Sequence, residues 1–305
     1  MEMKQISYGG FDAIEMVTSK VRMVVVTGTG PRVAFFGKPG GENLFSWFPD
    51  DIGRGDWKLL GGHRVWINRP DADESEDTYA ADNSPCKVET AGEEWIITGG
   101  VHPLLKISRG LRIKKVGEDT FQVTNFLRND GALLYSGGVW AVTCTHPLAG
   151  TTYAIPLGDR SRAWDMIKIV IPRQWGGNVC KVDDPQFTWT EDFLVIHPEG
   201  VQSKRMLASL QGAIIMTCPQ QGISFIKQSR FHSWGQYPLG CNLAIYIGSG
   251  NFTVEMESYG AQQTVQPGES IQNDETWKLV DEVFDWQSLE AVGCHLKGFR
   301  QPDLH

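Results

Sequence analysis

The sequence lacks the features that mark membrane proteins and nucleic-acid-binding proteins. No apolar run reaches the roughly 18 uninterrupted residues that a membrane-spanning helix needs. The formal net charge is −8, whereas nucleic-acid binding needs a basic surface and an anionic membrane attracts a basic face. We therefore expect neither a nucleic acid nor a membrane as a partner.

Signals for secretion, disulfide scaffolds and metal binding are also missing. Residues 1–12 are polar and show neither an apolar core nor a small-residue cleavage site. The six cysteines are scattered without a CxxC pair, which fits neither a zinc knuckle nor a small disulfide scaffold. The seven histidines follow no ligand spacing. We expect six reduced thiols, a cytoplasmic location and no metal.

Nucleotide-binding and helical patterns are nearly absent. Gly28-Thr29-Gly30 follows a strand-like run, but no helix or acidic residue comes after it at the spacing of a dinucleotide site. The chain contains no P-loop and no GxSxG elbow, and it shows neither a βαβ rhythm nor an internal repeat. We expect no organic cofactor.

What the sequence does contain is one strand-like segment after another. Several of these segments alternate apolar and polar residues, and 34 glycines and 15 prolines supply turns between them. The predicted strands are Val21–Thr27, Trp95–Thr98, Leu111–Lys115, Phe121–Leu127, Ile167–Ile171, Phe193–Ile196, Ala213–Thr217, Leu243–Ile247 and Phe252–Glu257. The class is therefore all-β, a sandwich or barrel, with residues 1–305 as a single domain. One short C-terminal helix is expected around Trp286–Val292, with Asp285 as N-cap and Gly293 as its stop.

Two segments read as long loops. Phe45–Gly62 combines aromatic residues, glycines and aspartates, and Asn68–Pro85 carries six acidic residues. The acids do not match the spacing of a calcium loop, so a solvated loop is the expectation for the second segment.

Three motifs resemble those of the galactose-mutarotase-like superfamily and its aldose-epimerase-related families. They occur in the family's order and are Gly61–Trp66 (GGHRVW), Phe121–Thr143 (FQVTNFLRN…GVWAVT) and Gly240–Ser270 (GCNLAIY…VEMESY…VQPGES). The resemblance covers the chain from about residue 20 to about residue 280. It implies a large antiparallel β-supersandwich with a carbohydrate site on its concave face, and a small-molecule carbohydrate as the partner.

The resemblance also implies a glutamate base and a histidine acid. The strand Phe252–Ser258 alternates, which places Glu255 and Glu257 on one face. Glu257 corresponds best to the family's glutamate, and Glu255 comes second. His146 is the counterpart of the histidine, although it falls one residue late, and a slip of one residue in a strand reverses the face. On this reading, His146→Ala slows anomer exchange by roughly 10²–10⁴.

Other polar and aromatic residues are candidates for holding the sugar. Arg64 and His63 follow a Gly-Gly turn, and tryptophan rings near polar loops suit the apolar faces of sugars. Arg230, His232 and Trp234 form a second candidate rim. The candidate binding residues are Arg64, His63, Trp66, Trp140, Glu255, Arg230 and Asn242.

These observations support carbohydrate recognition with aldose epimerase or mutarotase chemistry. The first alternative is a non-catalytic sugar-binding protein, and the second is a carbohydrate-cleaving enzyme that uses Glu255 and Glu257 as paired carboxylates. From the order of the motifs, we expect Arg64, Trp66, Trp140 and Glu257 to line one concave surface, and a binding module needs only the aromatic residues and Arg64.

Overall fold

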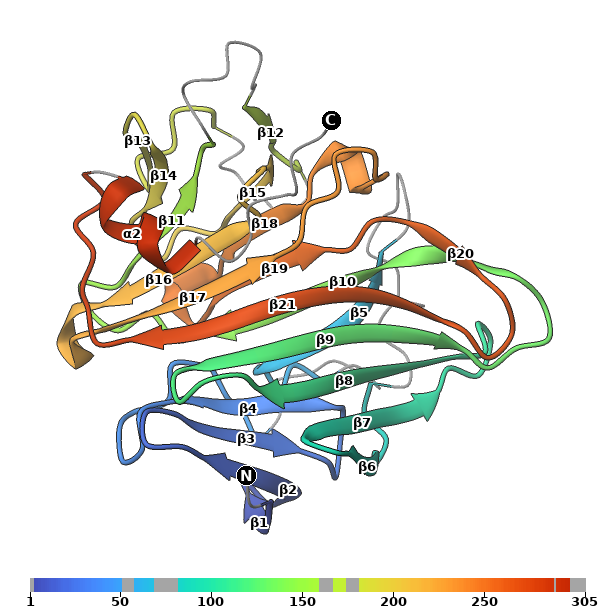
Figure 1. Ribbon diagram of the computed structural model, residues 1–305. Coiled ribbons are helices and arrows are strands. Elements are labelled where there is room, and N and C mark those ends of the chain that lie inside the picture. The colour runs from blue at the N-terminus through green and yellow to red at the C-terminus, as the bar shows by residue number, and fades with distance from the viewer. Residues whose placement is uncertain are drawn as a thin grey trace.

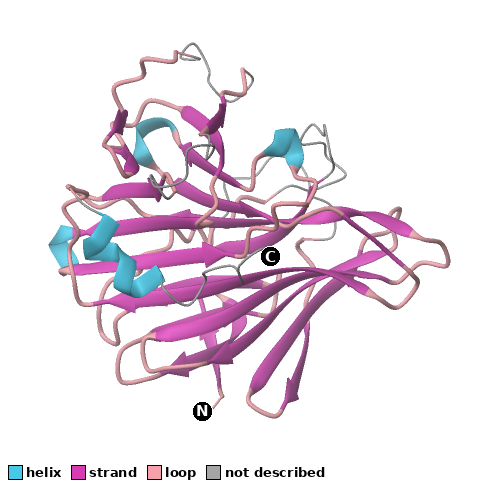
Figure 2. Ribbon diagram, turned by 45° about the horizontal axis from the view of Figure 1, so that its top comes forward, coloured by secondary structure: helices cyan, strands magenta, loops and turns pink. Residues whose placement is uncertain are grey.

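Two large antiparallel sheets pack face to face in the computed structural model (Figure 1). Strands dominate the chain, and its helical segments are short (Figure 2). The described residues are 3–50, 58–68, 82–158, 167–173, 181–287 and 289–296. This architecture confirms the predicted all-β class and the predicted antiparallel sandwich.

The first sheet has eleven strands and holds most of the candidate site residues. β20 (Gln263–Val265) pairs with the beginning of β10 and lies off the main path. From edge to edge, the other strands are β1 (Lys4–Tyr8), β2 (Phe11–Val17), β3 (Arg22–Val26), β4 (Arg32–Gly37), β5 (His63–Asn68), β10 (Tyr135–Thr145), β19 (Val254–Tyr259), β18 (Leu243–Ile247), β15 (Ser203–Ala208) and β12 (Lys168–Val170). β5, β10 and β19 are therefore neighbours although they are far apart in sequence.

The second sheet has ten strands. In order they are β13 (Phe187–Trp189), β14 (Phe193–Ile196), β11 (Thr152–Pro156), β16 (Ala213–Cys218), β17 (Ile223–Ser229), β21 (Ser270–Val280), β9 (Thr120–Asn129), β8 (Ile107–Lys115), β7 (Glu94–Val101) and β6 (Lys87–Ala91). In Figure 1, β21 and β9 pass in front of β5 of the eleven-stranded sheet.

The main hydrophobic core fills the space between the sheets. Val65, Ala141 and Met256 from the eleven-stranded sheet join one buried cluster with Phe225 and Trp277 from the ten-stranded sheet. Successive residues of a strand point to opposite faces, so every second residue of β5, β10 and β19 enters this core. Each fully buried aliphatic side chain of this kind contributes about 1.5–3 kcal/mol to folding.

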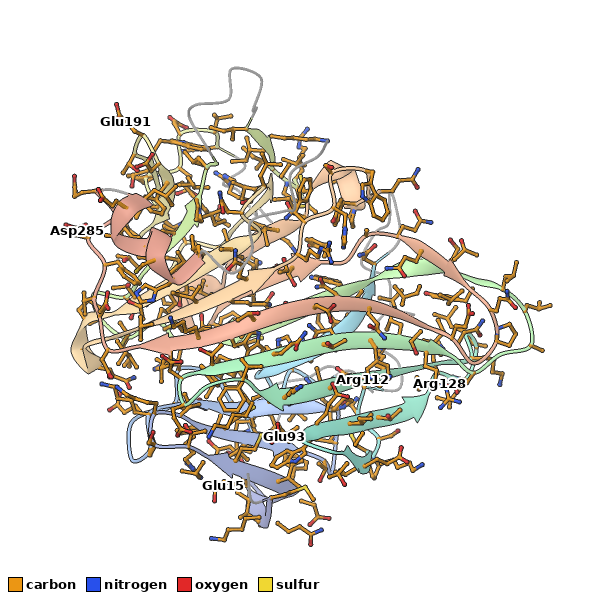
Figure 3. The ribbon with its side chains drawn as sticks, viewed as in Figure 1. Glu15, Glu93, Arg112, Arg128, Glu191 and Asp285 are labelled. Carbon is orange, nitrogen blue, oxygen red and sulfur yellow. The ribbon has the colours of Figure 1, made fainter. Side chains whose placement is uncertain are left out.

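Each outer face of the sandwich carries a buried cluster of side chains. On the ten-stranded sheet, Arg112 of β8 and Arg128 of β9 remain partly or fully exposed (Figure 3). On the eleven-stranded sheet, a second buried cluster includes Trp66, Trp140 and Tyr259. We call the face of the eleven-stranded sheet that points away from the core its outer face. The outer face of the ten-stranded sheet has a buried cluster of its own, which includes Phe193 and Trp286.

The helix α2 (Leu289–Leu296) lies near the C-terminus, as expected, but later than the predicted Trp286–Val292. Asp192 rather than Asp285 accepts the N–H of Leu289, at 3.0 Å. Gly293 lies inside the helix, where packing of the helix against β14 and β16 outweighs the low helix propensity of glycine. Three short 3₁₀ turns are η1 (Pro219–Gln221), η2 (Pro238–Gly240) and η3 (Ser249–Asn251). Of the helices in the described ranges, none is long and apolar enough to cross a membrane.

Candidate functional site

Four of the sequence-predicted side chains share the outer face of the eleven-stranded sheet. In the register of β5, β10 and β19, Val142 pairs with both Arg64 and Glu257, and Trp140 pairs with both Trp66 and Tyr259. Directly paired residues point to the same side of a sheet, and so do residues two apart on one strand. The structure therefore brings Arg64, Trp66, Trp140 and Glu257 onto one surface.

Glu257 is the carboxylate at the centre of this surface. Its side chain has no solvent exposure, and its Oε2 accepts hydrogen bonds from Trp140 Nε1 and Tyr259 Oη, both at 2.8 Å. Lys204 Nζ lies 3.1 Å from Oε1 and 5.0 Å from the centre of the Trp140 ring. Buried charges are normally paired in this way. The carboxylate is thus held at one oxygen by two neutral donors and faces one ammonium group at the other.

Glu255 lies on the same face as Glu257, one row further along the sheet. It is half-buried, it accepts the Cys144 thiol at 3.4 Å, and its strand partners are Cys144 and Tyr246. Burial raises the pKa of the Tyr246 phenol, and the charge of Glu255 adds to this effect. Because residues two apart on a strand point to the same side, both glutamates face the same side of β19.

A Gly-Gly turn sets the entry of Arg64 onto this face. Gly61 and Gly62 both have positive φ, 75° and 71°, a region that favours glycine. A Cβ atom at Gly61 would lie 2.4 Å from the Ser46 carbonyl oxygen, and one at Gly62 would lie 2.5 Å from that of Val33. Only glycine fits at both positions, so the GGHR segment is required for the path of the chain into β5.

Two arginines and one aspartate form a buried charge cluster beside Trp66. Asp82 Oδ2 accepts a hydrogen bond from Arg32 Nη2 at 2.8 Å and from Trp66 Nε1 at 3.2 Å, and Arg64 Nη1 lies 3.7 Å away. The Arg64 guanidinium lies over the Trp66 ring, 3.7 Å from its centre. Burial lowers the pKa of Arg32 to about 10, Asp82 opposes this, and Arg64 adds to it. Asp82 belongs to the acidic segment that we expected to be solvated, but it is buried; residues 69–81 of that segment lie outside the described residues.

His63 lies on the other face of β5, between the two sheets. Its Nδ1 is 2.8 Å from Thr143 Oγ1, its Nε2 is 2.7 Å from Asn125 Oδ1, and its ring meets Trp277 edge-on. Burial lowers the pKa of this imidazole to about 4 against the opposing charge of Glu275. The structure thus places His63 away from the surface that carries Arg64, because neighbours in a strand point to opposite sides.

Beneath Glu257, a buried ion pair joins the two sheets. Lys227 Nζ of β17 lies 3.3 Å from Glu275 Oε1 of β21 and donates to the Met256 carbonyl at 2.7 Å and the Ala141 carbonyl at 3.1 Å. Burial raises the pKa of Glu275, but the charge of Lys227, the charge of His63 and the hydrogen bonds from Ser258 and Trp277 together lower it below its ordinary value. Met256 precedes Glu257, so this ion pair fixes the strand that carries the carboxylate.

His146 does not lie beside Glu257. It is exposed and follows the last residue of β10, and its backbone N–H donates to the Leu44 carbonyl at 2.8 Å. Val142 is the strand partner of Glu257, so His146 lies four residues, or about 13 Å, further along β10. Cys144 occupies the position on the outer face that is nearest to Glu255.

The remaining candidates lie at the margin of this surface. Arg230 is exposed, and the rings of His232 and Trp234 meet at a tilt of 49°, with their centres 5.1 Å apart. The same loop carries Tyr237, which belongs to the buried cluster of Trp66 and Trp140. The Asn242 side chain is buried and occupied by the Ser209 backbone, through bonds of 2.7 and 2.9 Å.

Four residues near the site were not predicted from the sequence: Lys204, Arg32, Asp82 and Tyr259. Tyr259 closes the VEMESY motif, and its position two residues after Glu257 would have placed it on the same face. Lys204 and Arg32 carry no local signal, because they reach the surface through strands that pair only in the folded sheet. No group of three histidine, cysteine, aspartate or glutamate residues within the described part of the chain is placed to hold a metal ion.

The architecture is similar to that of several solved structures. A candidate aldose 1-epimerase from Escherichia coli K12 is 12% identical, with a TM-score of 0.54 and coverage of 92% of this chain and 99% of that one. A candidate mutarotase from Salmonella typhimurium is 13% identical, with a TM-score of 0.59 and coverage of 91% and 93%. A galactose mutarotase-like protein from Clostridium acetobutylicum is 10% identical, with a TM-score of 0.55 and coverage of 92% and 98%.

The sequence matches no protein-family model and no curated protein. At the identities just given, the similarity to solved structures shows the fold alone. The chain therefore has the galactose mutarotase-like fold, which confirms the resemblance seen in its motifs at the level of architecture.

Proposed function

We propose that the outer face of the eleven-stranded sheet binds a monosaccharide and that Glu257 accepts the proton of its anomeric hydroxyl, as in aldose 1-epimerase chemistry. One observation carries this proposal. Glu257 Oε2 is held by Trp140 and Tyr259, whereas Oε1 accepts no hydrogen bond within the described chain. The Lys204 ammonium lies 3.1 Å from Oε1 and balances its charge, but no donor of the described chain makes a hydrogen bond to this oxygen. A hydroxyl group of a bound sugar supplies that hydrogen bond.

The aromatic side chains around Glu257 suit the rest of a sugar. Trp66 and Trp140 meet edge-on with ring centres 4.9 Å apart, and Trp140 and Tyr259 are stacked at 5.9 Å. Such rings present apolar faces to sugar C–H groups, and their polar ends are already engaged by Glu257 and Asp82. Since these rings are buried, a sugar that reaches them must displace side chains of the same cluster, such as Tyr237.

Mutarotation needs a base and an acid within hydrogen-bond reach of one sugar. The base removes the proton from the anomeric hydroxyl, the bond between the anomeric carbon and the ring oxygen breaks, and the acid protonates that oxygen. Ring closure on the other face of the carbonyl reverses both proton transfers. With His146 about 13 Å away along β10, the ammonium of Lys204, 3.1 Å from Glu257 Oε1, is the proton donor in this proposal.

Cleavage of a glycosidic bond receives less support from the geometry. Glu255 and Glu257 come from one strand and point to the same side of it. The carboxylates of glycosidases instead flank the scissile bond. We therefore prefer anomer exchange to hydrolysis.

Anomer exchange followed by NMR or polarimetry tests the proposal with freshly dissolved α-D-glucose and α-D-galactose. The wild-type chain is expected to accelerate exchange, and Glu257→Gln is expected to abolish the acceleration while calorimetry still detects sugar binding. Glu89→Gln, on the exposed strand β6, is the matched control and keeps wild-type rates. Binding without acceleration by the wild type would move the function to non-catalytic sugar binding. Acceleration that survives Glu257→Gln would remove Glu257 as the base, with Glu255 next to test.

A further inference from the structure

The outer face of the eleven-stranded sheet holds two arginines whose hydrogen-bonding capacity is only partly used. Arg32 and Arg64 are both fully buried. Nε and Nη1 of Arg32, and Nε and Nη2 of Arg64, have no hydrogen-bond partner in the described residues. Each buried donor left without an acceptor costs about 1–3 kcal/mol, and more when it is charged. Four donors of this kind in one place point to a missing acceptor.

The charges of this cluster do not balance. A single carboxylate oxygen, Asp82 Oδ2, lies 2.8 Å from Arg32 Nη2 and 3.7 Å from Arg64 Nη1. Among the described residues, no other carboxylate forms an ion pair with either arginine. Within the described part of the chain, one positive charge of the Arg32–Arg64–Asp82 cluster is therefore without a counter-charge, and a buried charge requires one.

The two arginines lie in line with Glu257 across the sheet. Arg64, Val142 and Glu257 are paired across β5, β10 and β19, and Val33 of β4 pairs with His63 of β5. Continuing that antiparallel register places Arg32 beside Arg64 in the same row. Neighbouring strands are about 4.8 Å apart, so two spacings, about 10 Å of backbone, separate Arg64 from Glu257. The residue between them, Val142, has no polar side-chain atom to compete for a ligand.

We infer that Arg32 and Arg64 bind the carboxylate of a sugar acid whose anomeric hydroxyl lies at Glu257. This inference rests on the proposed function for the sugar ring and names its substrate class. Guanidinium groups match the two oxygens of a carboxylate through paired N–H bonds. The carboxylate carries one negative charge, equal to the excess on the Arg32–Arg64–Asp82 cluster. A phosphate monoester carries nearly two and overcompensates it.

Calorimetry with pairs of sugars that differ only at C6 tests the inference. The pairs are D-glucuronate with D-glucose and D-galacturonate with D-galactose, and D-glucose 6-phosphate and acetate are measured beside them. The wild type is expected to bind at least one sugar acid about tenfold or more tightly than its neutral partner. Arg32→Gln and Arg64→Gln are each expected to lose this preference while keeping the affinity for the neutral sugar.

Two further variants test the inference without removing Arg32 or Arg64, in case an arginine variant fails to fold. Asp82→Asn removes the competing carboxylate but keeps an acceptor for Trp66, so the preference for the sugar acid is expected to increase. Arg112→Gln, on the outer face of the ten-stranded sheet, is the matched control and leaves the preference unchanged.

Equal affinity of the wild type for the acid and neutral sugars would overturn the inference. So would a preference that persists in both arginine variants, and tighter binding of glucose 6-phosphate would replace the carboxylate by a phosphate. The proposed function fails separately. If the wild type prefers the sugar acid but does not accelerate anomer exchange, the arginine site stands and the proposed chemistry at Glu257 is wrong. If it accelerates exchange but shows no preference for the sugar acid, the proposed chemistry stands and the arginine site is wrong.

Discussion

The ammonium of Lys227 donates to the main-chain carbonyl of Met256 at 2.7 Å, so a side chain of one sheet holds the strand of the other that carries Glu257. The same nitrogen lies 3.3 Å from Glu275. The Lys227–Glu275 ion pair therefore holds the strand that carries Glu257. Removal of one partner leaves the other as an unpaired charge in the core.

Replacement of Lys227 by methionine is expected to destabilise the fold by about 3–5 kcal/mol, because it leaves the buried Glu275 carboxylate without its counter-charge. Urea denaturation at pH 7 measures this loss. The double variant Lys227→Met/Glu275→Gln is expected to recover part of it, since both charges are then gone. Lys87→Met, at an exposed position of β6, is the control and changes stability by less than about 0.5 kcal/mol. A loss as small as that for Lys227→Met would show that the ion pair contributes little.

The buried His63 predicts how stability depends on pH. Its pKa falls to about 4 in the folded chain, from an ordinary value near 6.5 in the unfolded chain. Between these values the unfolded state binds more protons, so stability decreases as the pH falls from 6.5 towards 4. The full effect is about 3 kcal/mol.

Denaturation of the wild type and of His63→Gln across pH 4–7 measures this contribution as the difference between the two slopes. The variant is expected to show the flatter profile. Gln5→Ala, at an exposed position of β1, is the control and keeps the wild-type slope. Coinciding profiles for the wild type and His63→Gln would contradict a neutral, buried His63.

The identity of the proton donor predicts a contrast between two basic residues. Lys204→Met is expected to slow anomer exchange by roughly 10²–10⁴, because it removes the ammonium 3.1 Å from Glu257. His146→Ala is expected to leave the rate unchanged, because His146 lies four residues beyond the partner of Glu257 on β10. NMR exchange spectroscopy with both variants decides the matter. The opposite pattern would restore His146 as the acid and require the end of β10 to shift.

The cysteines predict a graded reaction with a thiol reagent. All five cysteines among the described residues are free; Cys294 is exposed, and Cys144, Cys218 and Cys241 are buried. Burial raises the pKa of Cys241 to about 11 and that of Cys86 to about 12, which removes the reactive thiolate at neutral pH. Of the five described cysteines, Cys294 is therefore expected to react first in the native protein, and Cys294→Ser should lack its reaction phase. Six thiols should titrate after denaturation, and two or more stable disulfides would contradict the expectation of a reduced chain.

Much of the architecture follows from alternation in the sequence. The period of two in Phe252–Ser258 predicted that Glu255 and Glu257 share a face, and the strand β19 has that arrangement. The motif order predicted that Arg64 and Trp140 meet on that surface. Both predictions depend on properties within a strand or a turn, which the local sequence carries.

The rest depends on pairing between distant strands. His146 follows an apolar run as the family's histidine does, but β10 ends at Thr145, and the sequence has no signal for that end. Lys204 lies near Glu257 because β15 pairs with β18 and β18 pairs with β19. The alternation of residues within a strand does not predict which distant strands pair. Asp82 belongs to a run of acidic residues that predicts a solvated loop, whereas its burial is explained by Arg32, Arg64 and Trp66, which lie far from it in sequence or carry no local signal.

The order of strands in the eleven-stranded sheet decides when during folding a ligand site exists. β10 pairs with β5 on one side and with β19 on the other, so residues 63–68, 135–145 and 254–259 must all have reached the sheet before Arg64 and Glu257 share a face. A ligand of this face therefore binds the complete sheet and no partly folded chain. Its free energy of binding adds to the stability of the whole molecule through mass action, so the shift of the thermal midpoint with ligand concentration reports its dissociation constant.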